Sequence, residues 1–197
     1  GGSKGMGRAG AECFAADGAR VAVMARGRAA LDDTVARLTE LGSPDAVGLV
    51  VDASDAVSIT NGFAALKDRW GELNSLVFAV GPQVSQLPWD QVSDDQFIDA
   101  YVIGALSAVR SARAALPLLR AAKWGRIVNL AAMSARSQGF GLIEYTAAKA
   151  ALVSITKNLS LELAADEILV NTVSPGTYIS DQMVEHIATL PAEAGVS

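Results

Sequence analysis

Short apolar runs alternate along the chain with longer segments of helical periodicity. The runs at residues 20–25, 47–51, 75–81, 125–131 and 168–173 are bounded by glycine or polar residues and predict buried strands. Apolar residues recur at three- and four-residue steps over 9–16, 31–41, 93–121 and 142–163, which predicts helices. This alternation is typical of an α/β protein, a doubly wound parallel sheet of Rossmann type with helices on both faces.

Three polar or cyclic residues mark helix boundaries and bends. Asp55 is expected to cap a helix that runs toward Trp70, because aspartate accepts hydrogen bonds from free amides at a helix start. Ser93 and Gln96 have the spacing of a capping box and open the long helix that continues to about residue 121. Pro117 predicts a kink inside that helix.

Composition limits the classes of partner. With 197 residues, 51% of them hydrophobic, the chain has the size of one domain, residues 1–197. A net charge of −5 argues against nucleic acid or an anionic membrane as the main partner. Cys13 is the only cysteine and His186 the only histidine, so we expect neither an internal disulfide nor a metal site. No signal peptide or long uncharged apolar run occurs, which favours a cytoplasmic protein.

Tyr145 and Lys149 are the strongest candidates for chemistry. Four residues apart on one helix, they lie on the same face and can address one reaction centre. A nearby ammonium favours the phenolate and lowers the pKa of a tyrosine, which makes it a usable proton donor or acceptor near neutral pH. The plainer interpretation is an exposed helix face that carries an aromatic residue and a lysine.

The chain opens with a glycine-rich loop directly before a helix. Its glycines allow a tight turn and close approach of a phosphate, and the helix start supplies amide donors. The residues of this predicted pyrophosphate cradle are Gly1, Ser3, Lys4, Gly5, Met6 and Gly7. A glycine-rich tag is the alternative.

Arg26 follows the first predicted strand, where the adenosine ribose of a dinucleotide would lie. An acidic residue there favours NAD(H), whereas an arginine accommodates the 2′-phosphate of NADP(H). Ala25 and Arg26 stand at this point and Lys4 is in the loop, so NADP(H) is preferred. A solvated arginine at a strand end is the alternative. Asp52 could accept from the adenine amino group, and Gly81 allows the backbone to approach a ligand.

Together these motifs resemble the short-chain dehydrogenase/reductase family across essentially the whole chain. The resemblance implies hydride transfer between NADP(H) and a ketone or secondary alcohol, with Tyr145 as general acid or base and Lys149 on the nicotinamide ribose. Pro175 and Gly176 match the turn beside the nicotinamide, and Ser180 falls where the family often places a threonine. The implied cofactor-binding set is Gly1, Ser3, Lys4, Gly5, Met6, Gly7, Arg26, Asp52, Ala53, Ala79, Gly81, Tyr145, Lys149, Pro175, Gly176, Tyr178 and Ser180.

The chain also departs from the family pattern. Ala132 stands thirteen positions before Tyr145, where the family usually has a serine that donates to the substrate oxygen. Ser134 could replace it if the loop is re-registered, and is the third candidate catalytic residue. Tyr101, three residues before Gly104, corresponds to an asparagine of the family. These changes leave open an alternative function: an NADP(H)-binding protein with little catalysis and a sensing or interaction role.

The resemblance also bears on the ends of the chain and on assembly. The family's first strand lies in the middle of the sheet, so its apparent absence would leave a central gap. We therefore expect a domain that is incomplete at both ends, with native sequence upstream of Gly1 and the family's last strand beyond Ser197. In the family, helices corresponding to residues 100–119 and 147–163 pair between subunits, which predicts a homodimer or homotetramer.

Overall fold

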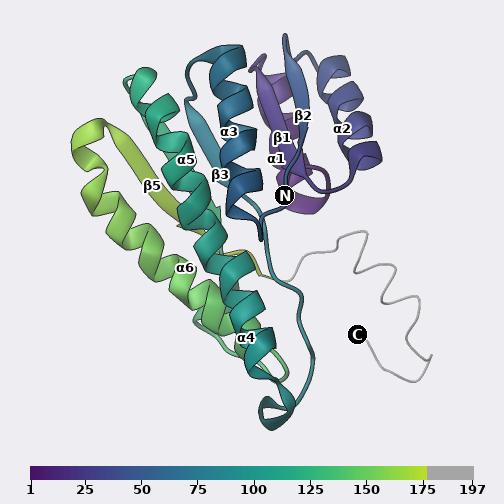
Figure 1. Cartoon of the computed structure of the whole chain (residues 1–197), viewed down its shortest axis with the longest axis vertical. Helices are drawn as coiled ribbons and strands as arrows, with labels where there is room; N and C mark the ends of the chain where they lie inside the picture. The colour runs from purple at the N-terminus through teal and green to yellow at the C-terminus, as the bar shows by residue number, and fades with distance from the viewer. Residues whose placement is uncertain (177–197) are drawn as a thin grey trace.

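The computed structural model describes residues 1–176 (Figure 1). Their elements follow one another as strands with intervening helices. The strands are β1 (Val21–Ala25), β2 (Ala46–Val50), β3 (Ser75–Phe78), β4 (Gly125–Leu130) and β5 (Ile168–Val173). The helices are α1 (Gly5–Ala16), α2 (Arg28–Glu40), α3 (Ala56–Trp70), α4 (Asp94–Tyr101), α5 (Ser107–Ala121) and α6 (Ile143–Glu162), with the π-helical segment η2 (Val102–Leu106) and short 3-10 turns. The predicted elements are thus present, with boundaries shifted by a few residues.

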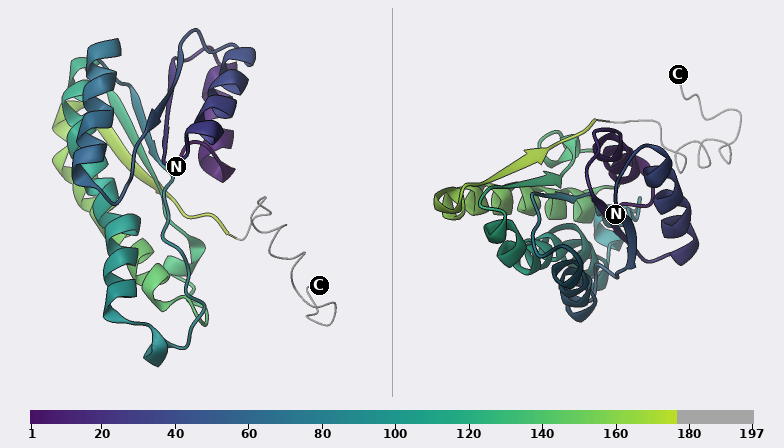
Figure 2. Two further views of the ribbon diagram at one scale, coloured as in Figure 1. Left: turned by 45° about the vertical axis from the view of Figure 1, so that its right-hand side comes forward. Right: turned by 90° about the horizontal axis from the view of Figure 1, so that it is seen from above.

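All strand pairs are parallel and helices cover both faces. Helices α1 and α2 lie on one side of the strands, and α3, α5 and α6 lie on the other (Figure 2). Each side has its own apolar core: Leu31 and Leu38 of α2 are fully buried against β1, and Leu119 of α5 is fully buried near Ile127 and Ile168. The predicted doubly wound α/β fold is confirmed.

The strands form two sheets. Within residues 1–176, β1 pairs with β2, and β3 pairs with β4, which pairs with β5; no ladder joins β1 to β3. The chain starts between these two edges, because the Gly1 and Gly2 nitrogens donate to the Met24 carbonyl at 3.0 and 3.1 Å. Gly1 also lies against the Ala79 carbonyl, which follows β3. The gap therefore lies where a central strand was expected; a strand preceding Gly1 stays a prediction.

The helix boundaries follow the expected capping chemistry. The Asp55 side chain accepts from the Val57 amide at 2.8 Å, and Ser93 with Gln96 forms the complete capping box. The long helix departs from α-helical geometry at η2, where it has a π-helical turn, and not at Pro117, which lies inside continuous α5. A π-helical turn is itself a recognised cause of helix irregularity, so this one does not require proline.

The strand predicted over 75–81 ends at Phe78. Beyond Phe78 the chain leaves the ladder, and the Val80 carbonyl accepts a hydrogen bond from the Lys149 ammonium instead of from a strand. The early end of β3 therefore opens the carboxyl edge of the sheet beside α6.

The continuous helical stretch Asp94–Ala121 is long and apolar enough to cross a membrane by length and composition. Half of its most apolar part is buried inside the protein, and the stretch packs against α3 and α6. A core helix of a globular domain has these same properties, so the stretch is weak evidence for a membrane span.

Candidate active site

A cavity of about 1540 Å³ lies at the carboxyl ends of the strands. Ligands of open α/β sheets bind at this edge, where strand order reverses. Most of the site residues suggested by the sequence line it: Gly1, Ser3, Lys4, Gly5, Met6, Gly7, Arg26, Asp52, Ala53, Ala79, Gly81, Tyr145 and Lys149. Tertiary structure thus joins the first residues of the chain to a helix that begins at residue 143.

The glycine loop is packed too closely for side chains. A Cβ atom on Gly7 would lie 1.9 Å from the Gly1 carbonyl oxygen, and one on Gly1 would lie 2.1 Å from the Ala79 oxygen. Gly5 has φ of +52°, a conformation that glycine adopts without steric cost. The Lys4 side chain does not cap the start of α1, and the first turn of this helix has no acidic residue. The first amides of α1 and the positive end of its dipole are therefore available to an anion. An uncapped helix start behind closely packed glycines is the arrangement that binding of an anionic group such as a pyrophosphate requires.

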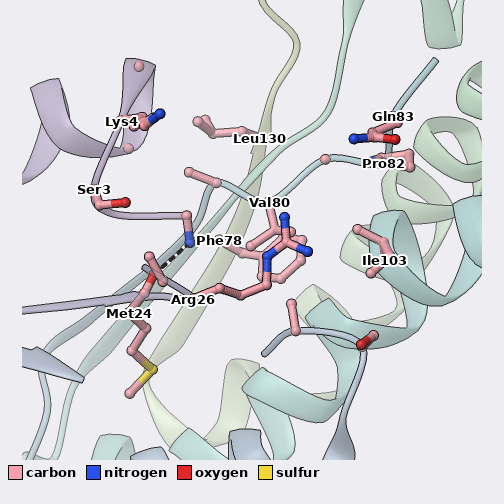
Figure 3. A pocket seen from close by; sticks show the side chains of 18 of the residues that line it. Ser3, Lys4, Met24, Arg26, Phe78, Val80, Pro82, Gln83, Ile103 and Leu130 are labelled. Carbon is pink, nitrogen blue, oxygen red and sulfur yellow. Dashed lines mark hydrogen bonds between the residues drawn. The ribbon is translucent and has the colours of Figure 1, made fainter. Parts of the chain in front are cut away.

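Arg26 and Asp52 come from the ends of neighbouring strands. Arg26 is exposed at the end of β1, and Figure 3 shows its side chain extending into the cavity, with Ser3 and Lys4 on one side and Gln83 on the other. Asp52 Oδ1 accepts from the Ser54 amide at 2.8 Å and from the Ser54 hydroxyl at 2.7 Å. These bonds, aided by the charge of Arg26, lower the pKa of Asp52, so it stays ionised at neutral pH.

Lys149 is buried, with 3% of its surface exposed. Its ammonium donates to the Leu130 carbonyl at 2.8 Å and to the Val80 carbonyl at 3.1 Å, and so joins the ends of β4 and β3 to α6. Burial lowers the pKa of Lys149 to about 8. A lysine near its pKa at physiological pH can both hold charge beside a reaction centre and exchange a proton.

Tyr145 is half-buried and lines the same cavity one turn before Lys149 on α6. The Lys149 nitrogen lies 5.9 Å from the centre of the tyrosine ring, within the range of a cation–π contact. Tyr145 and Lys149 therefore lie on one face of α6, and both line the cavity. The alternative interpretation, an exposed helix face, does not describe this arrangement.

Other candidate residues do not reach the cavity lining. Ser134 lies in the 3-10 turn Met133–Ala135, and neither Ser134 nor Ala132 lines the cavity. Pro175 and Gly176 also lie off the lining, and Tyr178 and Ser180 are outside the described residues. Tyr101 is 46% exposed, whereas Ile103 lines the cavity and Gly104 packs against Ala148. Ser134 therefore does not share the cavity with Tyr145 and Lys149, and its role as a substitute donor stays a prediction.

Sequence reasoning missed Glu144 and Ser85, which also line the cavity. Glu144 is 2% exposed, and its Oε1 accepts from the Ser85 amide at 2.7 Å. The available signal was a carboxylate directly before Tyr145 at the start of a mostly apolar helix. Within residues 1–176, no three His, Cys, Asp or Glu side chains are grouped closely enough to hold a metal ion.

Two curated proteins are similar to this chain in sequence. The chain is 34% identical over 184 residues to a sorbitol dehydrogenase of Cereibacter sphaeroides, covering 89% of this chain and 67% of that protein. It is 30% identical over 196 residues to the 3-oxoacyl-[acyl-carrier-protein] reductase FabG of Haemophilus influenzae, covering 100% of this chain and 78% of the reductase.

Two solved structures are similar to the fold as a whole. The L-sorbose reductase from Gluconobacter frateurii, complexed with NADPH and L-sorbose, superimposes with a TM-score of 0.94 at 27% identity, covering 99% of this chain and 74% of the reductase. A variant of the actinorhodin polyketide ketoreductase with NADPH superimposes with a TM-score of 0.90 at 28% identity, covering 100% of this chain and 76% of the ketoreductase. The family profile described as short chain dehydrogenase matches residues 1–189. The chain therefore belongs to the short-chain dehydrogenase/reductase family, whose members are oxidoreductases.

Proposed function

We propose that this protein is an NADP(H)-dependent oxidoreductase that transfers a hydride between the nicotinamide and a ketone or secondary alcohol. The observation that carries the proposal is a single cavity lined by Tyr145, Lys149 and the glycine cradle. By their names, sorbitol dehydrogenase and L-sorbose reductase act on a sugar alcohol and a ketose, and FabG acts on a 3-oxoacyl group carried by acyl carrier protein, which supports the reaction class.

NADP(H) is the proposed cofactor because two cationic side chains lie at the expected adenosine end. Lys4 and Arg26 both line the cavity, and the last residue of β1 is Ala25, which carries no carboxylate to repel a 2′-phosphate. The amides of Gly5, Met6 and Gly7 would hold the pyrophosphate, and Asp52 with Ala53 would contact the adenine. The two similar solved structures contain NADPH, which supports the same choice.

The bound nicotinamide supplies the hydride, and residues of this chain handle the proton. In the reductive direction, the Tyr145 hydroxyl donates its proton to the oxygen of the carbonyl group. Lys149 stabilises the resulting phenolate by its positive charge and orients the cofactor ribose. Holding the reactants in place supplies much of the rate acceleration, so catalysis can proceed with Ala132 in place of a hydroxyl donor. The loss of such a donor typically costs about 10² to 10³ in rate.

The catalytically impaired NADP(H)-binding protein is the competing function. Ala132 and the position of Ser134 outside the cavity favour it, whereas Tyr145 and Lys149 in the cavity favour the enzyme. Assembly as a homodimer or homotetramer through α4, α5 and α6 and a cytoplasmic location belong to the same proposal. Exposed Ile98 and Tyr101 on α4 and Leu161 on α6 support self-association.

The deciding experiment measures NADPH binding and NADPH oxidation by the purified chain with a panel of ketones, including ketoses and β-ketoesters. We expect saturable NADPH binding, carbonyl-dependent oxidation, and loss of oxidation in Tyr145→Phe. Binding without oxidation by the wild type would support the impaired binder, and absence of NADPH binding would contradict both functions.

A further inference from the structure

Glu144 is a buried carboxylate in the wall of the cavity that the reaction proposed above does not use. It lies in the first turn of α6, directly before Tyr145, and only 2% of its surface is exposed. One oxygen, Oε1, accepts from the Ser85 amide at 2.7 Å, across 59 residues of sequence. The other, Oε2, is buried and has no hydrogen-bond partner among the described residues. Burying an acidic side chain costs free energy, so this placement requires a compensating contact.

The Ser85 contact and the start of α6 provide that compensation. Burial pushes the pKa of Glu144 upward, but the hydrogen bond from Ser85 and the nearby backbone amides of Glu144 and Tyr145 outweigh it and leave the pKa below its usual value. The positive end of the helix dipole acts in the same direction. Glu144 is therefore ionised at neutral pH, and its bond to the Ser85 amide is charge-assisted and stronger than a neutral one.

Ser85 belongs to the loop of residues 82–88, which forms one wall of the cavity. Pro82, Gln83 and Val84 line the cavity beside Ser85, and Figure 3 shows Pro82 and Gln83 on the side opposite Ser3 and Lys4. The loop has no strand or helix of its own. Gln86 has φ of +57°, a conformation that side chains rarely adopt, so contacts with the rest of the protein must hold the loop.

Helix α6 holds this segment at two points that bracket Tyr145. Lys149 donates to the Val80 carbonyl before the loop, and Glu144 accepts from Ser85 within it. Gly141 supports the second contact, because a Cβ there would lie 3.2 Å from backbone atoms of Gln86. Loop and helix start are thus packed backbone to backbone at the position where the substrate would meet the tyrosine.

We propose that Glu144 is a positioning residue, which clamps Ser85 to the start of α6 and thereby fixes the wall against which the carbonyl substrate binds. This inference rests on the oxidoreductase function proposed above. Removing a hydrogen bond to a charged group typically weakens the arrangement it maintains by about one order of magnitude or more. Because Ser3 and Lys4 of the cradle lie on the opposite side of the cavity from Pro82 and Gln83, we expect the effect to fall mainly on the substrate and much less on the cofactor.

The test compares Glu144→Ala with Glu144→Gln, whose amide oxygen can still accept from Ser85. The control is Glu162→Ala, which removes an exposed carboxylate from the far end of the same helix. We expect Glu144→Ala to raise KM for the carbonyl substrate about tenfold, with little change in kcat or in Kd for NADPH. Glu144→Gln should recover most of that loss. A purely structural role would lower the active fraction and Tm while KM stayed the same, and that result would overturn the proposal.

Amide hydrogen exchange provides a readout that needs no turnover. Peptides covering residues 82–88 should exchange faster in Glu144→Ala than in the wild type, Glu144→Gln or Glu162→Ala. Unchanged exchange in this loop would overturn the clamp, whatever the kinetics. If the wild type reduces no carbonyl compound, the oxidoreductase proposal fails, and the exchange data still decide whether Glu144 holds the loop.

Discussion

The Lys149 ammonium nitrogen lies 5.9 Å from the centre of the Tyr145 ring while it donates to two backbone carbonyls, those of Val80 and Leu130. The lysine is therefore both a neighbour of the phenol and a link between strand ends and α6. Its charge is held at a fixed place by bonds that do not involve the phenol. This double role means that changes at Lys149 affect stability as well as chemistry.

Tyr145→Phe removes the hydroxyl that we assign to proton transfer and leaves the ring in place. We expect kcat to fall by about 10² to 10⁴, the usual contribution of a general acid or base, with a far smaller change in Kd for NADPH. Steady-state kinetics and fluorescence titration with NADPH measure the two quantities. Retention of wild-type kcat would show that the proton comes from another group.

The stability of the protein should depend on pH through Lys149. Burial lowers its folded-state pKa to about 8 from 10.5, so between these values the unfolded chain binds more protons than the folded one. Stability contributed by this group therefore rises as pH increases from 8 to 10.5, by on the order of 3 kcal/mol at most, and is constant below pH 8.

Lys149→Met isolates that contribution. The difference in unfolding free energy, variant minus wild type, should be largest at pH 7 and should shrink as pH rises to 10.5. Urea unfolding at several pH values measures it. A difference that is independent of pH would mean that the lysine has an ordinary pKa in the folded protein. The same variant is expected to lose activity at every pH.

The glycine cradle can be tested with two glycines of one helix. Gly7→Ala places a methyl group 1.9 Å from the Gly1 oxygen, so we expect loss of NADPH binding and a lower Tm. A Cβ on Gly10, also in α1, would have no atom within 4 Å. Gly10→Ala should therefore keep NADPH binding and stabilise the protein by about 0.5–1 kcal/mol. Equal NADPH affinities of the two variants would contradict the proposed cradle.

Arg26 should determine the choice between the two nicotinamide cofactors. Arg26→Ala removes one of the cations beside the proposed 2′-phosphate site, and we expect affinity for NADPH to fall about tenfold, with little change for NADH. Arg28→Ala is the control, because Arg28 is exposed nearby, bonds to the Gly48 carbonyl and does not line the cavity. If Arg26→Ala lost affinity for NADPH and NADH equally, the arginine would contribute to the stability of the protein and not to the choice of cofactor.

The sequence predicted local features well where neighbouring residues decide them. Capping at Asp55 and at Ser93 with Gln96 was correctly predicted because a cap bonds to amides only two or three residues away. The end of β3 was predicted too late, at residue 81 instead of Phe78, because the chain leaves the ladder there and Val80 bonds to Lys149, 69 residues further along.

By itself, the sequence determined the alternation of strands and helices, the glycine loop and the i,i+4 pair Tyr145 and Lys149, since periodicity and spacing are properties of a few adjacent residues. Only the tertiary structure decided that these motifs share a cavity that Ser134 does not line, and that Glu144 reaches Ser85. Burial and long-range hydrogen bonds depend on which distant segments pack together, and no local pattern encodes that packing.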